Sequence, residues 1–85
     1  MNIYQINSIT IIDGHAYPSF EPIENGSWIF STRDAAQEYL NRYLKDNSII
    51  GISLEVPIID EDAMEVGRQF IDYSSEDAYK IVELP

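Results

Sequence analysis

Apolar and polar residues change their spacing several times along this chain, and each spacing predicts a different element. Residues 2–13 are rich in isoleucine, tyrosine and threonine, a composition typical of a β-strand. They end at Asp13-Gly14, a dipeptide suited to the positive φ angles of a tight hairpin turn. We therefore expect a partner strand over residues 15–20, held at a sheet edge because Pro18 cannot donate to the strand ladder.

Helical spacing begins in the second quarter of the chain. A Glu-Asn-Gly turn at residues 24–26 leads into a short strand within residues 27–31. Ser31 or Thr32 can then cap an amphipathic helix over about residues 32–45. The apolar positions of this helix follow the i, i+3, i+4, i+7, i+8 rule: Ala36, Tyr39, Leu40, Tyr43 and Leu44.

Strict alternation of apolar and polar residues follows, and predicts a half-buried strand that ends at Pro57. Its predicted inner face holds Ile50, Ile52, Leu54 and Val56. Beyond it, Asp60 stands before a second stretch of helical spacing, which predicts an amphipathic helix over about residues 61–72. Its predicted buried face holds Ala63, Val66, Gly67, Phe70 and Ile71. Residues 79–84 predict a final strand.

This order of elements predicts the fold class. Strands and helices that alternate in this way, with the helices on one face of a sheet, are typical of an α+β protein. We expect a single compact two-layer α+β domain over residues 1–85. It combines a mostly antiparallel sheet of four to five strands with two amphipathic helices, at about 32–45 and 61–72.

Charge narrows the choice of partners. The 85 residues carry 15 Asp and Glu against five Lys and Arg, a formal net charge of −10. Such a surface repels phosphate backbones and anionic lipids, so we expect neither direct nucleic-acid binding nor membrane binding. The chain has no cysteine and no apolar run near the ~18 residues that span a bilayer. A cytoplasmic location is the expectation.

Consecutive carboxylates at residues 60–62 have two explanations. Asp60 can be a helix N-cap, with Glu61 and Asp62 facing the unpaired amides of the first turn. Alternatively, these residues belong to an anionic surface that binds a partner, because other carboxylates nearby have no helix start to serve. The candidate partner-binding residues are Glu55, Asp60, Glu61, Asp62, Glu65, Asp72, Tyr73, Glu76 and Asp77.

Metal binding and catalysis find little support in the sequence. Adjacent acids on a helix point in different directions, and the acidic run lacks the alternating ligands and turn glycine of a calcium loop. Zinc would require histidine or cysteine, and His15 is the sole candidate ligand of either type. No nucleophile motif or phosphate loop is present. We therefore expect no metal, no cofactor and no enzymatic activity.

A binding role is the remaining hypothesis. Carboxylates spaced along a surface can imitate a line of phosphates and occupy a basic protein surface that otherwise receives DNA or RNA. In size, charge and layout the chain resembles virus-encoded inhibitors of bacterial defence nucleases, such as anti-CRISPR and anti-restriction proteins, and also immunity proteins that neutralise toxin nucleases. The resemblance implies an inhibitor whose target is a basic protein such as a nuclease. The alternatives are a non-inhibitory accessory subunit that docks on a larger assembly, and a small enzyme or ligand carrier.

Overall fold

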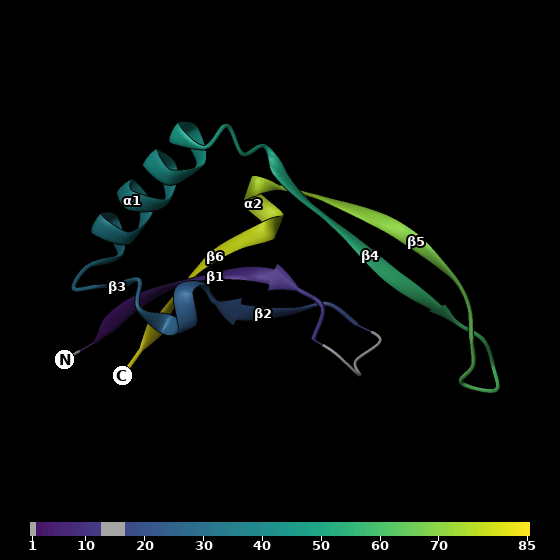
Figure 1. Cartoon of the computed structure of the whole chain (residues 1–85). Coiled ribbons are helices and arrows are strands. Elements are labelled where there is room, and N and C mark those ends of the chain that lie inside the picture. The colour runs from purple at the N-terminus through teal and green to yellow at the C-terminus, as the bar shows by residue number, and fades with distance from the viewer. Residues whose placement is uncertain (1, 13–16) are drawn as a thin grey trace.

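The protein is an α+β structure, as the sequence predicts. The structure, a computed structural model, describes residues 2–12 and 17–85. Its antiparallel strands form two sheets, one of four strands and one of two, with two α-helices (Figure 1). The elements are β1 (Ile3–Thr10), β2 (Ser19–Pro22), the 3₁₀ turn η1 (Ile23–Gly26), β3 (Ile29–Phe30), α1 (Arg33–Asp46), β4 (Gly51–Ile59), β5 (Glu65–Ser74), α2 (Ser75–Ala78) and β6 (Tyr79–Leu84).

β1 is the central strand of the larger sheet. It pairs with β6 over Ile3–Ser8, with β2 over Asn7–Thr10 and with β3 at Tyr4 and Gln5. β6 lies on the opposite edge of β1 from β2 and β3, because their pairing residues on β1 overlap. The predicted first and final strands are therefore confirmed. The predicted second strand exists but begins later than expected, because β2 starts at Ser19 and Pro18 lies before it; the Asp13-Gly14 turn lies outside the described residues.

Helix α1 covers this sheet and confirms the helix predicted at 32–45. The Thr32 hydroxyl accepts a hydrogen bond from the Ala35 amide at 3.1 Å and so caps the first turn. Apolar residues from the helix and the sheet then meet in one core, which includes fully buried Ile6 and Ala36. Trp28, which precedes β3, packs edge to face against Tyr43 with ring centroids 4.9 Å apart.

The second predicted helix, at 61–72, is wrong. These residues form a hairpin loop and most of β5, which pairs with β4 from Gly51↔Ser74 to Ile59↔Glu65. Helical spacing is overridden here by nine residue pairs with the preceding strand, and the β-branched and aromatic side chains of β5 suit a strand. The predicted phase of β4 is correct for Ile52, Leu54 and Val56, which are half-buried or buried on one face. The prediction is wrong for Ile50, which precedes β4 and is 91% exposed.

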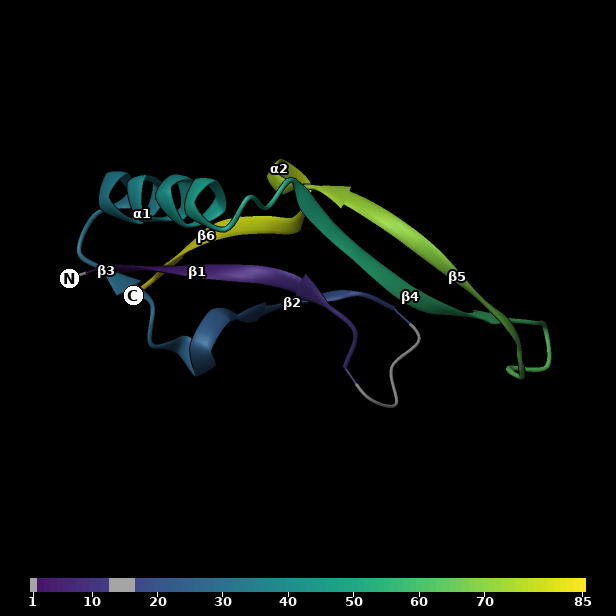
Figure 2. The same cartoon turned by 45° about the horizontal axis from the view of Figure 1, so that its top comes forward.

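β4, the loop at residues 60–64 and β5 form a projecting hairpin, here called the arm; the rest of the protein is called the body (Figure 2). The molecule measures 46 × 30 × 17 Å, and its radius of gyration is 15.2 Å. A compact chain of this length would have a radius of gyration of about 12 Å. The strands of the protein thus divide between a helix-covered body and an elongated arm, instead of forming one sheet.

The base of the arm is held closely against the body. The Ser75 amide donates to the Ile50 carbonyl at 3.1 Å, and Ile52, Leu54 and Tyr73 pack against the core of the body. At Gly51 the two strands approach so closely that a Cβ atom would overlap the Tyr73 carbonyl. Glycine is required at this position because any side chain would push the strands apart.

Candidate functional site

The arm has two faces of different character. Residues paired across an antiparallel ladder share a face, so the register of β4 and β5 assigns each side chain. The inner face, toward the body, is mainly apolar and partly buried: Ile52, Leu54, Val56, Ile71 and Tyr73. The outer face is mainly polar and exposed: Ser53, Glu55, Pro57, Arg68, Phe70 and Asp72.

Asp60 organises the tip of the arm. One of its carboxylate oxygens accepts hydrogen bonds from the amides of Asp62 and Met64, each at 2.9 Å. Its own amide donates to the Met64 carbonyl at 3.0 Å, and Ala63 adopts a positive φ of 59°. Asp60 therefore closes a hairpin loop, and its predicted role as a helix N-cap is wrong because no helix begins there.

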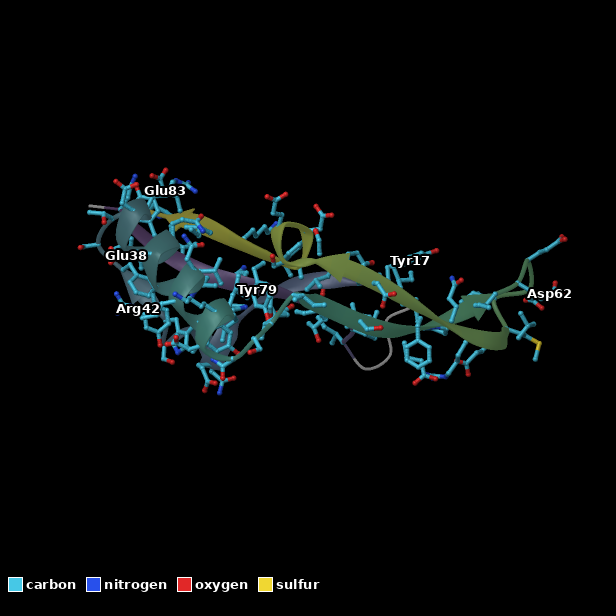
Figure 3. The ribbon with its side chains drawn as sticks, turned by 90° about the horizontal axis from the view of Figure 1, so that it is seen from above. Tyr17, Glu38, Arg42, Asp62, Tyr79 and Glu83 are labelled. Atoms are coloured by element: carbon cyan, nitrogen blue, oxygen red, sulfur yellow. The ribbon has the colours of Figure 1, made fainter. Side chains whose placement is uncertain are left out.

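Acidic residues are concentrated on the arm and its base. Eight carboxylates and one cation lie between Gly51 and Ala78, which is most of the excess negative charge of the chain. Asp62 lies at the far end of the molecule from Glu83, and from Glu38 and Arg42 of helix α1 (Figure 3). Carboxylates distributed along one narrow projection produce a negative potential that extends away from the body.

The structure separates the nine predicted site residues into two groups. Five are exposed carboxylates that accept no hydrogen bond and form no ion pair among the described residues: Glu55, Glu61, Asp62, Asp72 and Glu76. The other four have structural contacts. Asp60 closes the loop, Glu65 pairs with Arg68 at 3.1 Å, Asp77 accepts from the Ser74 hydroxyl at 3.2 Å, and Tyr73 packs against the core.

Sequence reasoning missed the apolar residues that the arm exposes. Phe70, predicted to be buried, is 73% exposed and lies on the outer face opposite Glu55. Among the described residues nine large apolar side chains are exposed, and five of them belong to the arm: Ile58, Ile59, Met64, Val66 and Phe70. The alternation Arg68, Phe70, Asp72 was the available signal, because a strand places these three side chains on one face.

Both strands of the arm carry features that discourage further strand pairing. Pro57 removes an amide donor from β4, and the ladder shifts between Ile58 and Ile59, which leaves Val66 of β5 as an extra residue. Proline and β-bulges on open strands reduce edge-to-edge association. A partner is therefore better placed on a face of the arm than along its edge.

Other parts of the described chain offer less chemistry. An open cavity of about 460 Å³ lies at the base of the arm, lined in part by Ile50 and Asp72. No three described Asp, Glu or His side chains converge as metal ligands would. No helix in residues 2–12 and 17–85 has both the length and the apolar character needed to cross a membrane. His15 lies outside the described residues.

At the far end of the body, the carboxylate of Glu83 has a pKa that its surroundings lower. The Tyr4 hydroxyl donates to Glu83 Oε1 at 2.7 Å, and this hydrogen bond is the largest of the influences that hold the pKa of Glu83 below its usual value. The guanidinium of Arg33 lies 5.4 Å from the centroid of the Tyr4 ring. Glu83 thus serves to tie β6 to β1, at the opposite end from the arm.

Comparison with known proteins gives no information on the function of this chain. No family model, no curated protein and no solved structure matches this chain.

Proposed function

We propose that this protein is an inhibitor that inserts its acidic arm into a basic, nucleic-acid-binding surface of another protein. The arm is the observation that supports this proposal, because it places exposed carboxylates on a narrow projection. The target is a basic protein, for example a nuclease. The protein acts by binding inside the cell, with no catalytic step and no cofactor, and it binds neither nucleic acid nor a membrane itself.

Shape and charge both suit such a target. A two-stranded hairpin is thin enough to enter a groove that accepts a nucleic-acid strand. The exposed carboxylates Glu55 and Asp72 lie along it, and Glu61 and Asp62 lie at its tip. Complementary charge accelerates encounter with a basic groove and disfavours neutral or acidic partners. Bound in this way, the arm would exclude the nucleic acid.

A second candidate is a non-inhibitory docking module of a larger assembly. The exposed apolar residues of the arm support it, because apolar side chains contribute to docking whether or not nucleic acid competes. The two functions differ in one measurable respect: an inhibitor and nucleic acid exclude each other on the target, whereas a docking module and nucleic acid bind together.

Affinity capture with the purified protein, followed by work on the purified captured partner, tests the proposal. The partner should bind DNA or RNA, and adding that nucleic acid should release the protein in proportion to its concentration. Affinity should fall by at least about tenfold between low and high salt, because raising the salt from about 0.1 to 1 M shortens the Debye length from ~10 to ~3 Å. Simultaneous binding of both would favour the docking module.

Matched charge variants locate the effect on the arm. Glu55→Gln, Glu61→Gln and Asp62→Asn together should weaken binding at least about tenfold, or ~1.4 kcal/mol. The control removes three exposed carboxylates from the body instead, through Glu21→Gln, Glu24→Gln and Asp46→Asn. Equal losses in both variants would show that overall charge, and not the arm, determines affinity.

A further inference from the structure

We infer that the outer face of the arm is a docking surface centred on Phe70, and that its occupant is a segment of a basic protein in which an apolar side chain lies beside Lys or Arg. This inference rests on the proposed function and specifies which face of the arm makes the contact and what it recognises.

Phe70 is an exception to the pattern of its strand. Its two nearest neighbours on the outer face of β5, Arg68 and Asp72, are charged, and the aromatic ring between them is 73% exposed. The ring of Phe70 is not part of the core, because the apolar residues that hold the arm to the body lie on the inner face. A large aromatic side chain left in water at the centre of a face is typical of a binding anchor.

The residues around Phe70 determine what it can bind. Glu55 is its direct cross-strand partner, so their Cβ atoms lie about 4.5–5.5 Å apart. Asp72 is the next residue on the same face of β5, and its carboxylate is exposed. Pro57, the next outer-face residue of β4 and opposite Arg68, adds apolar surface beside Glu55. Arg68, on the other side of Phe70, is paired with Glu65 at 3.1 Å, so the charges of the rim that form no ion pair among the described residues are carboxylates. Such a surface complements an apolar side chain flanked by cations.

Charge also decides between a second copy of this chain and a different protein. Two copies joined through this face would bring Glu55 and Asp72 of both copies into one interface, where Arg68, the cation of the face, is already paired with Glu65 at 3.1 Å. Each copy also carries a formal net charge of −10. Like charges placed opposite each other in an interface disfavour it strongly. The edges of the arm offer no alternative, because Pro57 and the bulge at Val66 interrupt them.

Selection from a library of random peptides displayed on phage tests this inference even while the target is unidentified. Wild-type protein should enrich peptides in which an aromatic or aliphatic residue lies close to Lys or Arg. Synthetic peptides made from the enriched sequences should then bind Phe70→Ala at least about thirtyfold more weakly. The Phe70→Leu variant retains an apolar anchor and should bind within a few-fold of wild type.

Two controls make the result specific. Ile29→Ala removes an apolar side chain that is 47% exposed on the body, and should leave peptide affinity unchanged. Glu55→Gln with Asp72→Asn should reduce the salt dependence of binding, whereas Glu21→Gln with Glu24→Gln should not. Circular dichroism of each variant should show the wild-type spectrum, because all the altered side chains are exposed.

Other outcomes separate the two proposals. Basic peptides that bind Phe70→Ala as well as wild type would overturn the docking surface and leave the charge-based function standing. Enriched peptides without Lys or Arg would overturn both. Failure to enrich any peptide, or enrichment that Ile29→Ala abolishes as fully as Phe70→Ala, would overturn the docking surface.

Discussion

The body and the arm differ in how they use apolar residues. In the body, Ile6, Ala36 and Ala78 are fully buried, and they belong to one cluster with Ile9, Leu40 and Tyr79. Among the described residues of the arm, Val56 is the single buried apolar side chain, while five large apolar side chains are exposed. Buried apolar area is the main source of folding free energy, so stability resides mostly in the body. The arm retains apolar groups in contact with water, where they are available to a partner.

Replacing a core residue of the body should have the largest effect. Ile6→Ala removes a fully buried side chain of the central strand β1, and should cost about 2–5 kcal/mol of unfolding free energy. Urea denaturation followed by circular dichroism measures it. Val66→Ala on the arm, where the side chain is 62% exposed, should change stability by less than about 0.5 kcal/mol. Similar losses in both would mean that the arm belongs to the folding core.

The junction between the two regions should be the next most sensitive point. Gly51→Ala adds a methyl group that overlaps the Tyr73 carbonyl, and should cost about 1–3 kcal/mol as the strands separate. Gly67→Ala is the matched control, because its Cβ would lie 3.7 Å from Ile58 Cδ1, an ordinary contact. NMR amide shifts should change around Tyr73 and Ser74 for the first variant. No difference in stability between the two would contradict the close approach at Gly51.

At the tip of the arm, neighbouring carboxylates should behave differently. Asp60→Ala removes the acceptor of two backbone amides and should cost about 1 kcal/mol. Glu61→Gln with Asp62→Asn should leave stability within about 0.5 kcal/mol of wild type, because both side chains are exposed. Thermal melting of the three proteins measures this. A larger loss in the double variant than in Asp60→Ala would show that Asp60 is not the carboxylate that stabilises the loop.

The smallest effect should come from the polar contact at the far end of the body. Tyr4→Phe removes the hydrogen bond that lowers the pKa of Glu83, so this pKa should rise toward its ordinary value. A lowered folded-state pKa stabilises the protein above the unfolded-state pKa, and that contribution disappears as pH falls through the folded-state pKa. The difference in Tm between wild type and Tyr4→Phe should therefore narrow in acid. NMR titration of the Glu83 carboxyl carbon checks the shift directly.

Local signals made the body predictable and the arm only partly so. The cap at Thr32 and the repeated apolar positions of α1 are encoded within one stretch of sequence, and so is the alternation of β4. β5 depends on pairing with β4, and its residues fit helical spacing equally well, so the sequence alone favoured the wrong element. The sequence shows directly that acidic residues gather in its last third, but the exposure of Phe70 followed only from the register with Glu55.

The hydrogen bonds at the tip have a consequence for which substitutions the loop can accept. Because Asp60 closes the loop through backbone amides, the chain direction there is independent of the side chains at positions 61 and 62. Positions 61 and 62 are exposed and can therefore accept other side chains without a change in the backbone of the loop. Substitutions at these two positions would change the charge of the tip while the loop keeps its conformation, so the charge and the conformation of the tip are determined by different residues.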